Sequence, residues 1–286
     1  MANLVEETRN IMKKYGIRAN KDLGQNFLIN NEVVENIVNS SEISQDDMVI
    51  EIGPGLGTLT KYLLEKAGKV LCIELDRKMI EILEDRFEKY SNFEIINDDV
   101  LKVDLNKIIK ENKENEKIKN VKIVANLPYY ITTPIIMKLL EEKLDIESIT
   151  VMIQKEVADR LIEIPSGKNT GAITYTIHYY CDSEKIMEVP NSSFIPEPEV
   201  TSEVIKMKIR KEPVVKVENP KVMFMIIKSA FMQRRKTLLN ALTNAQVFIS
   251  KQEGIKILNK LGLNENVRAE NLTIENYAEL AKEISK

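Results

Sequence analysis

The chain has 286 residues, enough for one large domain and a smaller one. Hydrophobic residues make up 43% and charged residues 30%, which excludes a disordered or fibrous protein. Cys72 and Cys181 are the two cysteines and form no CxxC pair, so we expect no metal site and no disulfide framework. The first 16 residues hold no apolar signal core, and no apolar run approaches the roughly 20 residues that cross a bilayer. We therefore expect a cytoplasmic protein with no membrane partner.

The charge balance argues mildly against a nucleic acid as the partner, because the net charge is −3 and the isoelectric point is about 5.6. Basic residues nevertheless gather in three groups: Lys13, Lys14, Arg18 and Lys21; Lys206, Lys208, Arg210 and Lys211; and Arg234, Arg235 and Lys236. Such groups can contact phosphate while acidic residues elsewhere set the total. On charge alone, solvated faces of the protein are the favoured interpretation.

Short apolar segments rich in valine and isoleucine alternate with helical patterns from about residue 30 to residue 165. The expected strands are residues 48–52, 70–75, 93–96, 121–125 and 149–153. The expected helices between them are residues 59–67, 78–90, 105–112 and 134–142. Alternation of this kind predicts an α/β fold, with a mostly parallel sheet covered by helices on both faces.

The character of the chain changes after this region. Residues 189–202 contain three prolines and are expected to be extended. Residues 200–209 alternate apolar and polar side chains, which predicts one more strand. Beyond Pro213 only helical patterns follow, over residues 221–243, 251–261 and 274–284. We predict a large domain over residues 1–210 and a small all-α domain over residues 211–286.

A glycine-rich turn follows the first expected strand. Residues 53–57 read GPGLG and precede a helix, and this order is the first unit of a nucleotide-binding α/β fold. Glycine lets the backbone adopt positive φ and approach a ligand closely. The spacing G-x-G-x-G differs from the G-x-G-x-x-G of dinucleotide enzymes, which disfavours a dehydrogenase. For the glycines alone, a purely structural turn is the alternative.

Acidic side chains follow the next two strands. Glu74 ends the second expected strand, where a carboxylate can accept hydrogen bonds from a ribose diol. Asp76 is expected to begin the following helix. Asp98 and Asp99 come after the third strand, where a carboxylate can accept a bond from the amino group of an adenine. Helix capping is the alternative for this pair, and we expect one of the two to serve it.

The fourth strand runs into the sequence Asn126-Leu127-Pro128-Tyr129. An adenine amino group is a poor nucleophile because its lone pair is delocalised, so a catalyst must hold the NH2 group with acceptors. The Asn126 side-chain oxygen and the Leu127 carbonyl can supply two of them. Pro128 restricts the turn, and Tyr129 offers a face on which a flipped-out base can stack. The alternative is an ordinary strand-ending turn.

These motifs, in this order, resemble the ribosomal RNA adenine dimethyltransferase family, specifically the type that acts on small-subunit RNA. The resemblance covers nearly the whole chain. It rests on residues 24–28 (GQNFL), 51–60 (EIGPGLGTLT), 126–129 (NLPY), 154–160 (QKEVADR), 194–202 (FIPEPEVTS) and 231–238 (FMQRRKTL). Tyr130 is a departure, because asparagine is frequent at that position in the family.

The resemblance implies a Rossmann-like class I methyltransferase sheet of seven strands, with the last strand antiparallel, and a helical C-terminal domain. It implies S-adenosyl-L-methionine as cofactor, S-adenosyl-L-homocysteine as product, and no metal. The implied cofactor residues are Gln25, Asn26, Leu28, Gly53, Gly55, Glu74, Asp99, Val100 and Asn126. The implied catalytic residues are Asn126, Leu127, Pro128, Tyr129 and Phe194, with the rings of Tyr129 and Phe194 on either side of the target adenine.

The resemblance also implies the substrate. Family members convert two adjacent adenosines near the 3′ end of 16S ribosomal RNA, within an immature small subunit, to N6,N6-dimethyladenosine. The residues expected to contact RNA phosphate are Arg234, Arg235 and Lys236, which gives the domain over residues 211–286 the RNA or ribosome contact and that over 1–210 the catalysis. We expect a monomer.

Three other functions are weighed against this one. A non-catalytic ribosome-assembly factor predicts damage to the glycine turn or to the Asn126 motif, and both are intact. The macrolide-resistance methyltransferases, which modify large-subunit RNA, usually carry isoleucine in place of Leu127 and lack Pro54. A DNA adenine methyltransferase predicts a target-recognition domain, which the compact C-terminal region does not suggest.

Overall fold

The structure is a computed structural model that describes residues 3–20, 23–115 and 118–285. Lys21, one member of the first basic group, lies outside the described residues. The chain divides into two compact units: residues up to Ala158 with Ser183–Ile209, and Asp159–Asp182 with Arg210–Lys286. Residues 159–182 thus group with the C-terminal helices. The division of function at residue 210 stays a prediction.

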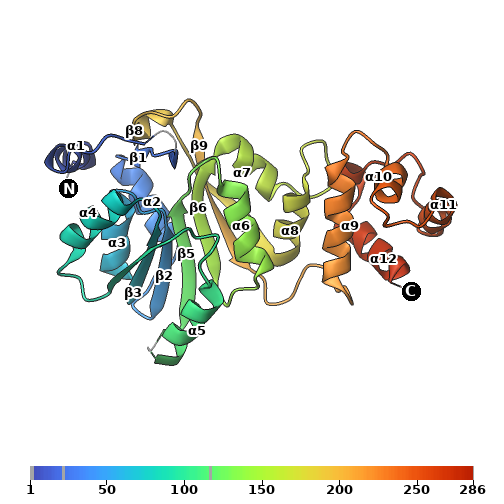
Figure 1. Ribbon diagram of the computed structural model, residues 1–286, viewed down its shortest axis with the longest axis horizontal. Helices are drawn as coiled ribbons and strands as arrows, with labels where there is room; N and C mark the ends of the chain where they lie inside the picture. Colours follow the sequence, from blue (N-terminus) through green and yellow to red (C-terminus); the bar gives the residue numbers. More distant parts are fainter. Residues whose placement is uncertain (1–2, 21–22, 116–117, 286) are drawn as a thin grey trace. The chain divides into compact units, whose positions relative to one another are not determined.

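A seven-stranded sheet forms the centre of the first unit, in the order β4-β3-β2-β5-β6-β9-β7 (Figure 1). Its strands are β2 (Asp47–Ile52), β3 (Lys69–Glu74), β4 (Phe93–Asn97), β5 (Asn120–Asn126), β6 (Ser148–Gln154), β7 (Cys181–Val189) and β9 (Ser202–Ile209). Strands β2 to β6 pair in parallel, while β9 runs antiparallel to β6. The expected class I methyltransferase sheet is confirmed.

Helices bury both faces of this sheet, as the uninterrupted apolar strands predict. One face packs on α2 (Asn31–Ser40), α3 (Thr58–Lys66) and α4 (Arg77–Phe87), whose buried residues share a core with alternate strand residues such as Val49 and Val70. Buried residues of α5 (Leu105–Asn115) and α6 (Thr132–Glu141) lie outside that core and cover the other face. Figure 1 shows α6 in front of the strands.

The N-terminal segment enters this unit through α1 (Leu4–Lys14) and a short strand, β1 (Phe27–Leu28). Strand β1 pairs with β8 (Phe194–Ile195) in a separate two-stranded sheet, with Leu28 opposite Phe194. This pairing holds Leu28 in place, and Gln25 and Asn26 come just before the strand; these three are among the residues predicted to contact the cofactor.

The second unit is helical. It contains most of α7 (Lys155–Ile162), then α8 (Ala172–Tyr180), α9 (Pro220–Met232), α10 (Leu238–Asn244), α11 (Lys251–Lys260) and α12 (Ile274–Ile284). Tyr175 and Tyr277 pack edge to face in its core, 4.9 Å between ring centroids. No helix in the described part of the chain combines the length and apolar character that a bilayer crossing requires.

One expected helix is wrong in its extent. The pattern over residues 221–243 predicts a single helix, but the structure breaks it between Met232 and Leu238. The break has a local cause, because Thr237 caps a new helix by accepting a hydrogen bond from the Asn240 backbone N–H, 3.3 Å away. The three consecutive basic residues lie in this break and not on a helix.

Candidate active site

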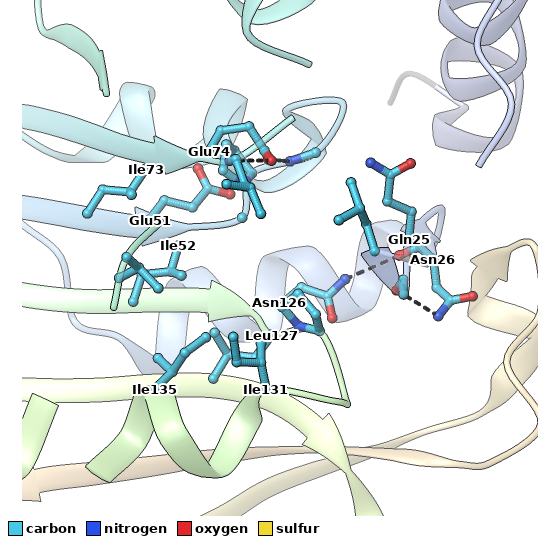
Figure 2. Close-up of a pocket in the computed structure, with 18 of the residues that line it drawn as sticks. Gln25, Asn26, Glu51, Ile52, Ile73, Glu74, Asn126, Leu127, Ile131 and Ile135 are labelled. Carbon is cyan, nitrogen blue, oxygen red and sulfur yellow. Dashed lines mark hydrogen bonds between the residues drawn. The ribbon is translucent and has the colours of Figure 1, made fainter. Parts of the chain in front are cut away.

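A pocket opens at the carboxyl ends of β2, β3 and β5, where parallel α/β sheets usually bind ligands. Its lining comes from residues 23–28, 51–56, 58–59, 73–75, 98–100, 126–131 and 135. These stretches surround about 1100 Å³ of space, which includes open solvent. Figure 2 shows side chains from these stretches pointing toward one another.

The glycine turn adopts the backbone that its sequence predicts. Gly53, Gly55 and Gly57 have φ of +67°, +57° and +79°, a region that other residues enter only at a cost. A Cβ on Gly57 would come within 2.6 Å of Phe87 and 2.7 Å of Leu83. Helix α4 therefore packs closely against the turn at Gly57, and the backbone amides of the turn lie close to the pocket.

An ionic contact holds α1 beside this turn. The half-buried guanidinium of Arg86 on α4 donates to the Leu56 carbonyl in the turn and forms a 2.6 Å ion pair with Glu7 of α1. Burial lowers the pKa of Arg86, while Glu7 opposes the shift. No sequence pattern indicates this contact, because Glu7 and Arg86 are far apart along the chain.

Glu74 lies at the end of β3 with its carboxylate in a cage of backbone amides. One oxygen accepts from the N–H groups of Leu75 and Asp76, at 2.8 and 2.9 Å, and the other accepts from Gly55 at 3.2 Å. Burial raises the pKa of Glu74, and these three bonds oppose the rise. A carboxylate has about four acceptor positions, so one stays open to a ligand hydroxyl.

The acidic pair after β4 lines the pocket and accepts backbone hydrogen bonds within a turn. Neither residue forms the expected helix cap, because α5 begins at Leu105 and Asp104 accepts from the Lys107 N–H at 3.0 Å. Asp98 accepts from the Asp99 N–H at 2.7 Å, and Asp99 accepts from the Leu101 N–H at 3.0 Å. Val100 lies beside them, almost fully buried. The turn therefore presents two carboxylates and one apolar side chain to the pocket.

Asn126, at the end of β5, has its amide fixed by the N-terminal segment. Its Nδ2 donates to the Asn26 carbonyl at 3.3 Å, as Figure 2 shows. Because a carbonyl oxygen can only accept, the amide nitrogen must face Asn26. The Asn126 Oδ1 then accepts no hydrogen bond from any described residue, and neither does the Leu127 carbonyl. Two consecutive residues therefore each offer the pocket a hydrogen-bond acceptor that no described residue occupies.

The turn after Asn126 is held from both ends. The Leu127 N–H donates to the Met152 carbonyl of β6 at 3.1 Å. The Pro128 carbonyl accepts from the Thr132 hydroxyl at 3.1 Å and from the Ile131 N–H at 3.2 Å, at the start of α6. These bonds fix the backbone that carries the two open acceptors.

The two tyrosines that follow differ in their surroundings. The half-buried Tyr129 forms a hydroxyl–hydroxyl hydrogen bond of 2.5 Å with Ser202 on β9, and burial raises the pKa of its phenol. Tyr130 is 59% exposed, and its ring lies against Gly24, where an added Cβ would be 3.4 Å away. Tyr129 thus has a defined ring position at the rim of the pocket.

The N-terminal segment closes one side of the pocket. The Gln25 side chain donates to the Asp76 carboxylate at 3.0 Å and accepts from the Asn20 N–H at 2.9 Å. Asp76 also caps α4 through the Lys78 N–H, as its position after β3 predicts. Gln25 therefore links the N-terminal segment to the residues that follow β3.

Sequence reasoning assigned no role to Glu51, which also lines the pocket. Its side chain lies in the sheet core and accepts from Thr60 at 2.6 Å and from the Cys72 thiol at 3.5 Å. Burial raises the pKa of Glu51 to about 7. The signal was present in the sequence, because an acidic residue inside a strand buried on both faces is out of place.

The structure brings most of the predicted site together. Every residue predicted for the cofactor lines the pocket: Gln25, Asn26, Leu28, Gly53, Gly55, Glu74, Asp99, Val100 and Asn126. So do Leu127, Pro128 and Tyr129 from the predicted catalytic set. The roles assigned to these residues stay predictions.

Phe194 is the exception. Its side chain is 1% exposed, it belongs to the core shared with α2 and α3, and it is not among the described residues that line the pocket. The structure therefore does not place its ring where a base could stack, and the predicted stacking role gains no support from its position.

The basic residues predicted to contact RNA lie in the second unit. Arg234 donates to the Lys168 and Thr170 carbonyls, both at 3.1 Å, so its guanidinium holds the loop between α7 and α8. Arg235 and Lys236 are exposed. In the described part of the chain no ion pair to either of these two residues occurs.

Known proteins resemble this chain over almost its whole length. The model of the ribosomal RNA adenine dimethylase family matches residues 16–286. A ribosomal RNA small subunit methyltransferase A from Alkaliphilus metalliredigens is 50% identical over 279 residues, covering 98% of this chain and 96% of the relative. The protein of that name from Clostridium acetobutylicum is 48% identical over 277 residues, covering 97% and 98%.

A solved structure agrees with these sequence matches. The crystal structure of a dimethyladenosine transferase from Plasmodium falciparum superposes with a TM-score of 0.76 at 26% identity, covering 91% of this chain and 97% of that one. The family match, the relatives and the pocket at the carboxyl ends of the strands agree. The chain belongs to the ribosomal RNA adenine dimethylase family.

Proposed function

We propose that the protein transfers methyl groups from S-adenosyl-L-methionine to the N6 atoms of two adjacent adenosines near the 3′ end of small-subunit ribosomal RNA. The product is N6,N6-dimethyladenosine. One observation carries the proposal: the open Asn126 Oδ1 and the open Leu127 carbonyl lie in the same pocket as Glu74 and the glycine turn. The pocket thus combines a binding site suited to a nucleoside-type cofactor with two hydrogen-bond acceptors for an amine.

The residues of the pocket fit the cofactor. Gly53 and Gly55 line the pocket without side chains, and they have positive φ, which other residues adopt only at a cost. The remaining acceptor position of Glu74 suits a ribose hydroxyl. Asp99 and Val100 would take the adenine of the cofactor, and Gln25, Asn26 and Leu28 would close the site. When bound, the cofactor supplies an electrophilic methyl group on a sulfonium sulfur.

The acceptors orient the substrate amine. Two N–H bonds of an adenine amino group donate to Asn126 Oδ1 and to the Leu127 carbonyl, which turns the nitrogen lone pair away from both acceptors. The residues act by position and by their fixed dipoles. No general base is required, because the extra proton can leave after methylation. His178, the single histidine of the chain, takes no part.

Tyr129 holds the adenine. Its ring is fixed at the rim of the pocket, and stacking of a base on an aromatic ring contributes about 1–3 kcal/mol. Stacking on Phe194 as the second ring would require the buried side chain to leave the core.

The RNA is held by charge as well. Arg235 and Lys236 are exposed in the break between α9 and α10, and they would neutralise phosphates at the cost of few side-chain contacts within the protein. Arg234 supports them by fixing the neighbouring loop. The proposed substrate is an immature small subunit that the protein binds as a monomer.

The test uses cofactor labelled in its methyl group, small subunits from cells that lack this modification, and nucleoside analysis of the RNA. We expect labelled N6,N6-dimethyladenosine at two adjacent positions near the 3′ end. Mature, already dimethylated subunits are the matched control and should take up no label. Label found only in large-subunit RNA, or no label in adenine, would contradict the proposal.

A further inference from the structure

The hydroxyl of Tyr129 is bonded to an anchor that belongs to a different part of the sheet. Its oxygen lies 2.5 Å from Ser202 Oγ, and the two residues are 73 positions apart in sequence. Tyr129 follows β5, whereas Ser202 begins β9, the strand that runs antiparallel to β6. The bond therefore joins the turn that carries the open acceptors to the far side of β6.

Ser202 is held rigidly. It is fully buried and pairs with Gln154, the last residue of β6. The preceding residue is fixed too, because the Thr201 carbonyl accepts from the Lys155 N–H at 3.0 Å. A buried serine on a paired backbone has little freedom, so its hydroxyl is a fixed point in the molecule.

A tyrosine ring has two side-chain torsions. Its Cβ is set by the turn, which Leu127 and Pro128 fix through their backbone hydrogen bonds. A hydrogen bond at the opposite end of the ring determines the first torsion and so the direction of the ring axis. The hydroxyl oxygen lies on the axis of the second torsion, so the bond holds the ring in place without by itself setting its rotation about that axis. A base that stacks on a ring held in this position has its exocyclic amine at a defined place relative to Asn126.

We propose that Ser202 is a positioning residue for methyl transfer, and that it acts by bonding the Tyr129 hydroxyl and so fixing the position of the ring on which the target adenine stacks. This inference rests on the proposed function. Burial raises the pKa of the Tyr129 phenol above its ordinary value, so the phenol is neutral at physiological pH. Its hydroxyl therefore serves the hydrogen bond to Ser202 and does not act as a general base.

The test is a double-mutant cycle with Ser202→Ala, Tyr129→Phe and the double variant. Turnover, KM for immature subunits, cofactor affinity by calorimetry and Tm are measured for each. We expect each single variant to lower kcat about tenfold, the order expected for losing one buried hydrogen bond that sets geometry. The double variant should be no worse than either single variant, because both remove the same bond. Cofactor affinity should stay within about twofold.

Ser148→Ala is the matched control. Ser148 is also a buried serine of the β6–β9 pair, but it lies at the opposite end, across from Lys208. Its replacement removes a buried hydroxyl without touching the pocket, so kcat should be unchanged. A loss of kcat in this control equal to that in Ser202→Ala would show that the effect is structural.

The remaining outcomes separate this inference from the proposed function. Wild-type protein that methylates no adenine would overturn both. Active wild type with unchanged kcat in Ser202→Ala, or additive losses in the double variant, would overturn the positioning role alone. If Ser202→Ala fails to fold, Tyr129→Phe removes the same bond from the half-buried partner, and unchanged kcat in that variant would equally overturn the role.

Discussion

At the level of single residues, the neighbours of a side chain decide what it can offer to a ligand. The Asn26 carbonyl forces the Asn126 amide into one orientation and leaves its oxygen toward the pocket. Three backbone amides occupy most of the Glu74 carboxylate, so this residue both shapes the glycine turn and offers one acceptor. Chemistry and local folding therefore use the same atoms.

Glu51 predicts how the stability of the protein depends on pH. Burial raises its pKa from 4.5 to about 7, so the folded state binds the proton more tightly than the unfolded state does. The contribution of protonated Glu51 to the free energy of unfolding is fully present below pH 4.5 and is lost as the pH rises through 7. At 1.36 kcal/mol per pKa unit, the loss is about 3 kcal/mol. Urea unfolding at pH 5 and pH 8 measures it.

Glu51→Gln is the control for this prediction, because the amide oxygen can still accept from Thr60 but does not titrate. All other groups titrate alike in both proteins. We expect the wild type to lose about 2–3 kcal/mol more than the variant between the two pH values. Equal pH dependence in the two proteins would show that the Glu51 carboxyl is not buried as described.

At the level of elements, the short β1–β8 pair determines how the N-terminal segment meets the pocket. Leu28 of β1 lines the pocket, while its partner Phe194 faces the core. The sequence match around Phe194 suggested a ring beside the substrate, but burial decides the position of the ring, and burial depends on contacts distant in sequence.

Phe194→Leu and Phe194→Ala distinguish packing from stacking. If the ring is a core residue, Phe194→Ala lowers the free energy of unfolding by about 3–5 kcal/mol, whereas Phe194→Leu costs much less because most of the volume is kept. We expect Phe194→Leu to retain nearly full methylation. A tenfold or larger loss of kcat/KM in a stable Phe194→Leu protein would instead favour the stacking role.

At the level of the whole molecule, the strand and helix periods predicted the parallel sheet, and the motifs after its strands predicted the residues of the pocket. Each of these features can be recognised in a short stretch of sequence. The parallel order of the strands then brings the motifs together, because all the carboxyl ends meet at the same edge of the sheet. Other contacts were not predictable. Arg86 meets Glu7 and Leu56 only in the folded protein, and the break at residues 233–237 depends on a cap and not on periodicity.

The exposed basic pair in the second unit gives a prediction about RNA binding. Replacing Arg235 and Lys236 together with alanine should weaken binding to immature subunits, and should lower the slope of log affinity against log salt by about 2 if each contacts one phosphate. Cofactor affinity should not change. Filter binding at several salt concentrations measures the slope.

Lys251→Ala with Lys256→Ala is the matched control for this experiment. It removes the same charge from exposed positions on α11 of the same unit. An equal loss of slope in both double variants would mean that total charge, and not the break between α9 and α10, determines binding.

The most direct measurement is the turnover of Asn126→Ala on immature small subunits, together with its Tm and its affinity for S-adenosyl-L-methionine. If Asn126 Oδ1 holds the adenine amine, kcat should fall at least about 100-fold, as for the loss of one preorganised catalytic group, while the fold persists and cofactor affinity changes only a few-fold. Near-normal formation of dimethyladenosine by the folded variant would contradict the account.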